Sequence, residues 1–360
     1  MNNYYKLRKK QRNKYSALKI SLFIILLLFL GGGYFGYKYF KWIFYPNVEL
    51  ENKKQIYFYV KTGADMDEVL DSLNSKEIIK NKKSLKWVAK KKNYQQNIHP
   101  GKYLIKNKMN NNELVDLLRS GKETTVNVTF NIIHTKKELA GSITKNIEAD
   151  SVEVLHLLNN QKYCNKYGFS PETIMCMFLP NTYEFYWDTN AKELIEKMHK
   201  EYENFWTQQR KKKAKDIGLT PLEVSILASI VQAEQNKHPE ERPKVAGLFI
   251  NRLQKGMKLE SDPTVIYAKR DLSINRVLDK DKKIDSPYNT YKHKGLPLGP
   301  INLPNIKSLK AVLNYDKHNY LFMCAKPDST GLHNFAKNLR KHNYYARKYR
   351  NWLNKKGIYR

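Results

Sequence analysis

An uncharged apolar run at residues 20–37 constrains the fold of this chain more than any other feature of its 360 residues. The run consists mostly of Leu, Ile, Phe and Gly, and it lies between Lys19 and Lys38. A helix rises about 1.5 Å per residue, so the run spans about 27 Å, close to the thickness of the hydrocarbon core of a bilayer. The sequence therefore predicts a transmembrane helix at residues 20–37.

The charges around this helix predict its orientation. Residues 1–19 contain seven Lys and Arg residues and no Asp or Glu. By the positive-inside rule this basic arm stays in the cytoplasm, so the rest of the chain is expected on the outer, periplasmic side of the cytoplasmic membrane. A cleaved signal peptide is the alternative. The glycines at residues 31–33, followed by bulky Tyr34 and Phe35, make a poor cleavage site, which favours an uncleaved single-pass anchor.

After the anchor, the apolar pattern predicts an α+β chain in two parts. Residues 38–50, with Trp42, Tyr45 and Pro46, are typical of an aromatic belt and a short juxtamembrane linker. Residues 51–125 are expected to form a small βα module, and residues 126–360 a larger α+β domain. The predicted elements of the module are strands at 56–60 and 100–105 and helices at 65–73, 84–91 and 111–119. In the second part, the pattern predicts one long helix at 192–212, a strand at 320–325 and a basic helix at 340–354.

A predicted helix that begins at Thr220 carries the candidate catalytic residue. Thr220, Pro221 and Glu223 have the spacing of a capping box with proline at the first helical position. Glu234, near the end of this helix, falls on its apolar face, opposite a face of Ser and Gln. Burial and the negative end of the helix dipole both disfavour a carboxylate there, so the pKa of Glu234 is expected to be raised. A carboxyl group that stays protonated near neutral pH can act as a general acid.

A structural role for Glu234 is the alternative, in which Arg242 or Arg252 neutralises a carboxylate at the edge of the core. The neighbouring segments favour catalysis, because they carry amides, hydroxyls and aromatic rings, a mixture that suits a sugar better than a phosphate. These segments are a helix at residues 239–255, which presents Asn251, a turn at 262–264, and Pro- and Gly-rich loops at 286–291 and 295–301.

Six ordered motifs in the second part of the chain resemble one known family. They are LASIVQAE, AGLFINRL, GMKLESDPTVIYA, SPYNTY, GLPLGPI and LHNFAKN. In this order they resemble the endolytic murein transglycosylases, the family called MltG or YceG-like, whose members are membrane-anchored lytic enzymes that cut the glycan strands of peptidoglycan. Family members usually carry two acidic residues, two positions apart, on the first helix, and the second is catalytic. Here Gln232 stands in the first position, so the resemblance implies that Glu234 is the catalytic residue.

The resemblance implies a mechanism that needs one carboxyl group. Glu234 would protonate the bond between N-acetylmuramic acid and N-acetylglucosamine, and then act as a base toward the muramyl 6-hydroxyl. The product would be a 1,6-anhydro end that terminates elongation of a nascent glycan strand. Candidate substrate-binding residues are Asn251, Asp262, Tyr288, Asn289 and His333, together with Tyr183 and Glu184 in a segment that matches the family's Phe-Pro-Asp-Thr-Tyr type motif. For Tyr183 and Glu184, a packed core strand is an equal alternative.

Two other functions stay open from the sequence. One is a hydrolytic muramidase in which Asp262 or Glu184 serves as the second carboxylate and water completes the reaction. The other is a non-catalytic, membrane-anchored protein that binds the wall through residues 51–125. This module resembles the LysM-like subdomain of the family, and LysM modules bind N-acetylglucosamine polymers. A spacer that lifts the second part off the membrane is the alternative for the module.

The formal net charge of +31 must be interpreted together with the anchor. In a cytosolic chain it would suggest nucleic acid. Because most of the chain is predicted outside, the expected partners are membrane lipid and peptidoglycan glycan strands, with peptidoglycan synthases as candidate protein partners, and no nucleic acid. No cofactor or metal is predicted, since the sequence lacks a P-loop, a dinucleotide fingerprint and zinc-ligand spacing. Cys164, Cys176 and Cys324 leave one disulfide open without specifying a pairing.

Overall fold

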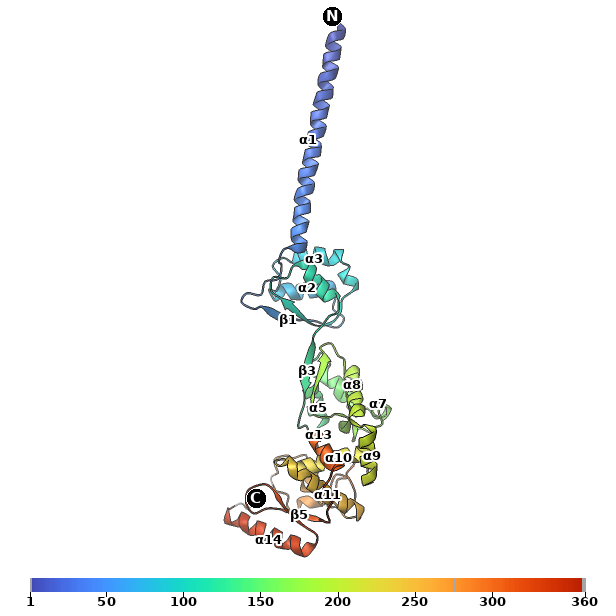
Figure 1. Cartoon of the computed structure of the whole chain (residues 1–360), viewed down its shortest axis with the longest axis vertical. Helices are drawn as coiled ribbons and strands as arrows, with labels where there is room; N and C mark the ends of the chain where they lie inside the picture. The colour runs from blue at the N-terminus through green and yellow to red at the C-terminus, as the bar shows by residue number, and fades with distance from the viewer. Residues whose placement is uncertain (1, 275, 358–360) are drawn as a thin grey trace. The chain divides into compact units, whose positions relative to one another are not determined.

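The chain is mixed α and β, as the sequence predicted, and it divides into two compact units (Figure 1). The structure is a computed structural model that describes residues 2–274 and 276–357. Unit 1 comprises Met1–Thr125 with Tyr186–Asp188, and unit 2 comprises Val126–Phe185 with Thr189–Arg360. In the described residues the strands form three two-stranded sheets, one in unit 1 and two in unit 2, and helices supply the rest of both cores.

Helix α1 (Asn2–Phe44) is a single continuous helix, drawn in blue in Figure 1. Its segment Leu18–Phe44 is long and apolar enough to cross a membrane. Large apolar side chains along it face outward; Phe29, for example, is 77% exposed. Such a surface is stable in lipid and not in water. The predicted N-terminal apolar helix is therefore confirmed, and its properties are consistent with either a membrane anchor or a signal sequence.

The rest of unit 1 packs three helices on one antiparallel pair of strands. Strand β1 (Gln55–Val60) pairs with β2 (Gly101–Lys106), so that Gln55 lies opposite Lys106 and Val60 opposite Gly101. Asp65 and Asn110 begin their helices with capping boxes, and Asn81 caps the third helix with its side chain. The helices are α2 (Met66–Ser75), α3 (Lys82–Lys91) and α4 (Asn111–Arg119), with a 3₁₀ turn η1 (Tyr94–Gln96) between α3 and β2.

Residues 38–50 differ from the expected linker. Helix α1 continues to Phe44, and the Tyr39 ring stacks on Trp87 of α3 with their centroids 4.7 Å apart. Val48 and Leu50, at 1% and 7% exposed, belong to the core of unit 1. Their apolar side chains fill space between the helices and the strands, so the segment is part of the folded unit, which begins before residue 51.

Unit 2 begins with a strand pair surrounded by helices. Strand β3 (Thr125–Thr129) pairs with β4 (Thr182–Tyr186), and the Thr129 and Thr182 hydroxyls lie 2.8 Å apart across the pair. The predicted long helix at 192–212 is instead two helices, because buried Trp206 ends the first and the Thr207 side chain caps the second. The helices are α5 (Lys136–Ile143), α6 (Ser151–Asn159), α7 (Gln161–Lys166), α8 (Ala191–Phe205) and α9 (Gln208–Ile217), with a 3₁₀ turn η2 (Ile174–Met177).

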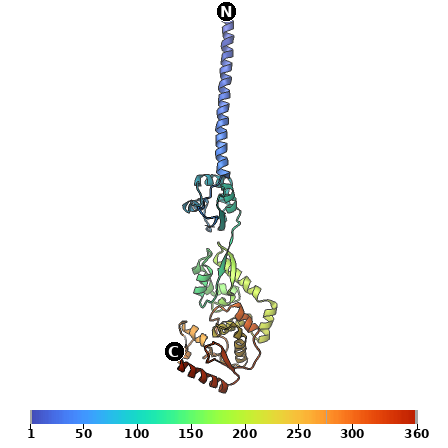
Figure 2. The same ribbon diagram turned by 60° about the vertical axis from the view of Figure 1, so that its left-hand side comes forward.

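Helix α10 (Pro221–Glu234) lies at the centre of the second half of unit 2. It packs against α11 (Arg242–Gln254), α12 (Asp262–Lys269) and α13 (Ile306–Leu313), and Figure 2 shows these helices from a second direction. The predicted helix at 239–255 is a 3₁₀ turn η3 (Pro239–Glu241) that leads into α11. A further 3₁₀ turn, η4 (Asp281–Lys283), lies between α12 and α13.

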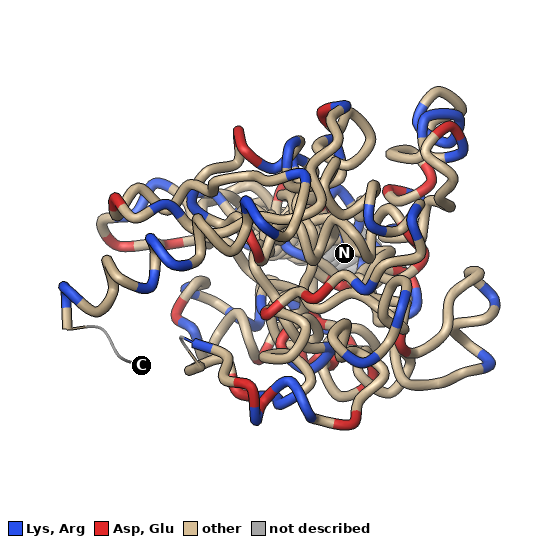
Figure 3. The backbone as a smooth tube through the Cα atoms, turned by 90° about the horizontal axis from the view of Figure 1, so that it is seen from below, with Lys and Arg blue, Asp and Glu red and all other residues tan. Residues whose placement is uncertain are grey.

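A small hairpin and a basic helix close unit 2. Strand β5 (Phe322–Ala325) pairs antiparallel with β6 (His333–Ala336), and α14 (Leu339–Lys355) packs against both. Helix α14 contains Lys and Arg but no Asp or Glu, as the blue segments near the C-terminus show in Figure 3. Cys164 and Cys176 are buried, Cys324 is partly buried, and all three are free thiols.

Candidate active site

Helix α10 positions Glu234 at its C-terminal end. The predicted capping box is present: the Thr220 hydroxyl accepts from Glu223 N at 3.2 Å, and Glu223 Oε2 accepts from Thr220 N at 2.7 Å. From Val224 to Gln232 every residue of the helix is buried. The face of Ser and Gln expected in solvent is therefore also buried, because other parts of unit 2 supply hydrogen-bond partners for it. The helix is partly exposed at its two ends, at residues 221–223 and at Ala233 and Glu234.

The carboxyl group of Glu234 accepts a short hydrogen bond from a buried serine. Ser261 Oγ donates to Glu234 Oε1 at 2.5 Å, and Ser261 N donates to Thr290 Oγ1 at 3.0 Å. Burial raises the pKa of Glu234 to about 7, the Ser261 hydrogen bond lowers it, and the charge of Asp262 raises it. The electrostatic effects of His333 and Arg252 lower it to a smaller extent. Glu234 can therefore carry a proton at neutral pH.

The two arginines that could have neutralised Glu234 have other partners. Arg242 Nε donates to the Gln235 carbonyl at 2.8 Å, and its Nη1 donates to Ser308 Oγ at 3.0 Å. Arg252 Nη1 donates to Glu260 Oε2 at 2.9 Å. Among the described residues Glu234 forms no ion pair, and the charges of His333 and Arg252 have only minor effects on its pKa.

Asp262 is a second carboxyl group at this site, and a tyrosine holds it. Tyr291 Oη donates to Asp262 Oδ1 at 2.6 Å. Burial and the neighbouring charges of Asp262 and Glu234 raise the pKa of Tyr291, so it remains a neutral hydrogen-bond donor. Sequence reasoning missed Tyr291, although it ends the SPYNTY motif. Its contact with Asp262 joins two motifs that are far apart in the sequence.

Gln232 joins α10 to the segment before α13. Its Nε2 donates to Asn302 Oδ1 and to the Leu303 carbonyl, each at 3.1 Å. Its Oε1 accepts from Asn305 N at 2.8 Å and from Ser308 Oγ at 3.0 Å. An amide supplies both donors and acceptors for these contacts, whereas an ionised carboxylate would supply acceptors alone. The glutamine at this position is therefore matched to its surroundings.

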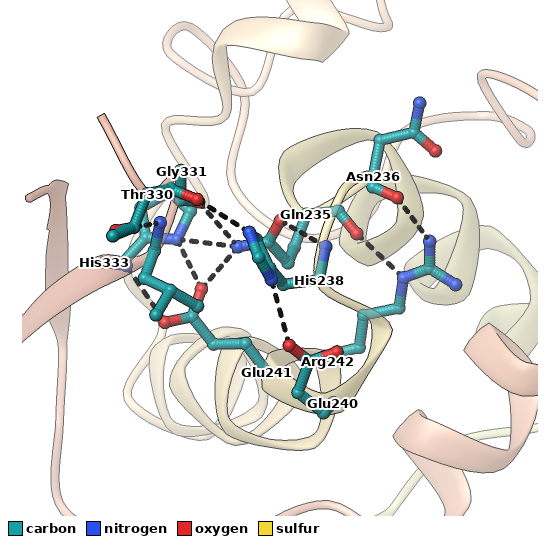
Figure 4. A network of polar contacts seen from close by, with 10 residues as sticks. Gln235, Asn236, His238, Glu240, Glu241, Arg242, Thr330, Gly331 and His333 are labelled. Atoms are coloured by element: carbon teal, nitrogen blue, oxygen red, sulfur yellow. Dashed lines mark hydrogen bonds and ion pairs between the residues drawn. The ribbon is translucent and has the colours of Figure 1, made fainter.

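His333 belongs to a polar network just beyond the end of α10 (Figure 4). Its Nδ1 lies 2.7 Å from Glu241 Oε2, and its backbone N donates to Glu241 Oε1 at 2.9 Å. Gln235 Nε2 donates to the Gly331 carbonyl at 3.0 Å, and His238 N donates to Gln235 Oε1 at 3.0 Å. These contacts attach the start of β6 to α10 and place His333 where it acts electrostatically on Glu234.

In the described part of the chain, no hydrogen bond or ion pair joins the other candidate residues to Glu234. Asn251 Nδ2 donates to the His318 and Tyr320 carbonyls, at 2.7 and 3.0 Å. Asn289 is fully buried, and its Nδ2 donates to the Lys282 and Ile284 carbonyls, each at 2.8 Å. Tyr183 is a buried residue of β4 whose Oη donates to the Leu179 carbonyl at 2.6 Å. Glu184, next to it, is exposed.

Two neighbouring cavities, together called the groove, lie beside the catalytic candidate. The first, of about 210 Å³, is lined by Ala233 and Pro263, the sequence neighbours of Glu234 and Asp262. The second, of about 710 Å³, is lined by Tyr288. The cavities share His134, Tyr267 and Leu272 on their walls, so they are adjacent to each other. In the described residues no cluster of His, Cys, Asp and Glu could hold a metal ion.

The fold and the site together define a class of protein: an α+β domain in which one protonatable carboxyl group ends a buried helix beside a groove. A sequence profile of the YceG-like family matches residues 58–348. Because this match covers most of the chain, the chain belongs to the YceG-like family.

Relatives with known names extend over most of the chain. A Bacillus subtilis (strain 168) protein named endolytic murein transglycosylase is 29% identical over 348 residues, which cover 91% of this chain and 93% of that protein. A protein of the same name from Streptococcus pneumoniae (strain D39) is 27% identical over 345 residues. These residues cover 86% of this chain and 61% of that protein. The crystal structure of a YceG-like protein from Listeria monocytogenes has a TM-score of 0.51 and 26% identity, covering 81% of this chain and 99% of that chain.

Proposed function

We propose that this chain is a membrane-anchored endolytic transglycosylase that cleaves peptidoglycan glycan strands. One observation carries the proposal: Glu234, whose pKa is raised to about 7, has no ion-pair partner among the described residues and lies beside a groove. The family of the chain and the names of its relatives supply the substrate class. Peptidoglycan is the polymer that such a groove would bind.

In this proposal Glu234 acts first as an acid and then as a base. Oε1 accepts a hydrogen bond from the Ser261 hydroxyl. Oε2 has no hydrogen-bond partner among the described residues, so Oε2 can carry the proton. Oε2 gives this proton to the oxygen that joins N-acetylmuramic acid to N-acetylglucosamine, and the bond from the muramyl C1 to that oxygen breaks. The carboxylate then takes the proton of the muramyl 6-hydroxyl, whose oxygen bonds to C1. The products are a 1,6-anhydro end and a free hydroxyl, and no water is consumed.

Asp262 has a distinct role in the same proposal. The muramyl C1 becomes positively charged as its bond to the leaving oxygen breaks, and a nearby carboxylate stabilises such a charge. The Tyr291 hydroxyl, which donates to Asp262 Oδ1 at 2.6 Å, keeps this carboxylate oriented. Asp262 therefore serves as a fixed negative charge, while Glu234 moves the proton.

The decisive experiment compares wild-type protein with Glu234→Gln on purified glycan strands. General acid–base catalysis is typically worth about 10²–10⁴-fold, and here one group serves both steps, so a loss of at least that size is expected. The products are separated by mass spectrometry, in which an anhydro end lacks the mass of one water. Glu193→Gln, at an exposed position in α8, is a matched control. A folded Glu234→Gln protein with normal activity would rule out the proposed role.

A hydrolytic muramidase is the second candidate, because the charge of Asp262 acts directly on Glu234. A glycosidase that uses water usually has two carboxyl groups in its active site. The two candidates differ in their products. Hydrolysis leaves a free reducing sugar that borohydride reduces, whereas transglycosylation leaves an anhydro end that borohydride does not change.

For unit 1 we infer a role in binding glycan, as a LysM-like module would. A cavity of about 510 Å³ in unit 1 lies between the loop that precedes α2 and the segment before β2, and Asp65, Gln95 and Gln96 line it. Carboxylate and amide groups of this kind bind sugar hydroxyls. Gln96→Ala is expected to weaken binding of the whole chain to insoluble peptidoglycan and to leave cleavage of soluble fragments unchanged. Equal retention of the variant and the wild type would contradict this role.

A further inference from the structure

The larger cavity of the groove carries charged residues that the proposed chemistry does not use. Its wall includes the cations Lys136, Lys137 and Arg270 and the acids Glu138 and Glu172. Both acids have neutral partners, since Glu138 Oε2 accepts from His134 N at 2.9 Å and Glu172 Oε2 accepts from Ser170 Oγ at 2.6 Å. None of the three cations forms an ion pair with a carboxylate among the described residues.

Lys136 is the most enclosed of these cations. Its Nζ donates to the Pro171 carbonyl at 3.1 Å and to the Leu158 carbonyl at 3.4 Å. An ammonium group has three N–H donors, so one donor remains for a ligand in the cavity. Burial lowers the pKa of Lys136, and the charge of Glu172 on the same wall opposes this shift. A carboxylate bound beside it would compensate this charge.

Arg270 occupies an unusual backbone position on the same wall. It follows α12 with a φ of 54°, in the left-handed region. Glycine adopts this conformation at no steric cost and is the common residue after a helix, so an arginine there is disfavoured by the backbone. Its side chain is exposed and lines the larger cavity. The planar guanidinium can bind a carboxylate through two hydrogen bonds.

The remaining wall is aromatic and adjoins the catalytic end of the groove. The rings of Tyr267 and Tyr288 lie 4.8 Å apart, and Tyr267 lines both cavities. A ligand that extends from Glu234 past Tyr267 would thus contact the aromatic rings first and then the cations of the larger cavity. This mixture of apolar, cationic and acidic groups fits a peptide with carboxylates and an amine better than it fits a uniformly charged polymer.

We propose that the larger cavity binds the peptide stem of the muramyl residue whose bond is cleaved, with Lys136 and Arg270 contacting the carboxylates of the stem. The inference rests on the proposed function, because it takes peptidoglycan as the substrate. It makes the enzyme selective for strands that still carry peptides. Glycan strands stripped of their peptides would lose these contacts and bind more weakly.

Binding measurements test this selectivity without requiring cleavage. The full chain carrying Glu234→Gln is titrated calorimetrically with N-acetylmuramyl pentapeptide and with N-acetylmuramic acid. The peptide-bearing ligand is expected to bind at least about ten-fold more tightly, and Lys136→Met or Arg270→Ala should each remove about ten-fold, the size of one charge-assisted hydrogen bond. Lys307→Met, at an exposed position in α13, is the control. Equal affinities for the two ligands, or unchanged affinities in both variants, would overturn the proposal.

A cleavage assay distinguishes failure of this inference from failure of the proposed function. Wild-type protein is given peptide-bearing strands and the same strands stripped by an amidase. Lys136→Met should raise KM for the peptide-bearing strands about ten-fold and leave KM for stripped strands unchanged. Cleavage without any preference for peptides would reject the peptide cavity and keep the transglycosylase. Absence of cleavage by the wild type, with peptide binding intact, would reject the transglycosylase alone. Tighter binding of polyphosphate than of the muramyl peptide would show instead a site for a phosphate polymer.

Discussion

At the scale of single residues, opposing effects set the protonation of Glu234. Burial disfavours its charged form, and the hydroxyl of Ser261 favours it through a 2.5 Å hydrogen bond. Burial has the larger effect, so the pKa rises to about 7. A group that must first donate and later accept a proton performs both steps best when its pKa is close to the working pH.

The raised pKa of Glu234 predicts how stability depends on pH. The carboxyl group ionises at its ordinary pKa of 4.5 in the unfolded chain and at about 7 in the folded chain. Between these values the folded state keeps a proton that the unfolded state has lost, so stability should fall as the pH rises from about 4.5 to about 7. Glu234→Gln removes this titration. The melting temperature of the wild type, measured relative to that of Glu234→Gln, should therefore decline across this range, and parallel curves would contradict the raised pKa.

Removing the hydroxyl of Ser261 should shift the pH dependence of activity. Without this donor the carboxylate of Glu234 is less stable, so Ser261→Ala should move the alkaline limb of the kcat/KM profile upward by about one pH unit. Ser225→Ala is a matched control, because within the described residues the only hydrogen bond of the buried Ser225 hydroxyl is to the Pro221 carbonyl of the same helix. Profiles of kcat/KM against pH on soluble glycan provide the measurement. An unshifted limb in Ser261→Ala would show that this hydrogen bond does not control the proton of Glu234.

At the scale of elements, buried polar contacts hold α10 in place in addition to its apolar residues. Gln232 bonds the segment at 302–308, and Ser229 Oγ accepts from Ile301 N at 3.1 Å. Asn302 Nδ2 in turn donates to the Ser229 carbonyl at 2.9 Å. These bonds attach the GLPLGPI loop and the start of α13 to the helix that presents Glu234. The polar positions of α10 thus determine where the loop lies.

This arrangement predicts that Gln232→Glu destabilises unit 2 at neutral pH. The new carboxylate would face the Asn302 and Leu303 oxygens, which need donors, and the loss should be about 1–3 kcal/mol. In acid the loss should shrink, since a protonated carboxyl group can donate one hydrogen bond. Gln209→Glu, on the exposed surface of α9, is the control. Urea unfolding at two pH values tests the prediction, and equal stability of both variants at neutral pH would refute it.

At the scale of the whole molecule, the end of α1 belongs to unit 1 as well as to the apolar helix. Asn111 Nδ2 donates to the Trp42 carbonyl at 2.7 Å, and Val48 and Leu50 lie in the core. A soluble fragment should therefore begin near Lys38 and not at residue 51. Residues 51–360 alone should be less stable in unit 1 by about 1.5–3 kcal/mol for each buried apolar side chain that is lost. Thermal unfolding of fragments 38–360 and 51–360 measures the difference, and identical unfolding would contradict the assignment of Val48 and Leu50 to the core.

The charges before the apolar helix predict that the parts of both units that follow this helix lie outside the cytoplasm. A reporter enzyme fused after residue 125, at the end of unit 1, should be active only when it is exported, because the basic arm keeps the N-terminus inside. Replacing the Lys and Arg residues of the arm by Gln should reduce export of the reporter. A reporter active in the cytoplasm would reject the proposed orientation and, with it, access to peptidoglycan.

Several features of fold and site were predictable because they depend on residues close together in the sequence. The capping box at Thr220, the course of α10 to Glu234 and the apolar helix near the N-terminus each arise from local spacing. The helix at 192–212 was predicted as continuous because its charged surface pattern continues through Trp206. Its break arises from burial of that ring, which depends on residues elsewhere in the chain.

The sequence by itself determined that Glu234 is the candidate acid, since an ionisable group at the end of an apolar helix is visible as a pattern. Only the tertiary structure decided what surrounds it. Ser261 donates a hydrogen bond to Glu234, and Tyr291 donates one to Asp262. Arg242 and Arg252 form hydrogen bonds with other groups. The physical reason is that hydrogen bonds and burial join groups that are distant along the chain. Helical periodicity reports only the direction in which a side chain points, whereas the pKa of a buried carboxyl group depends on every group packed around it.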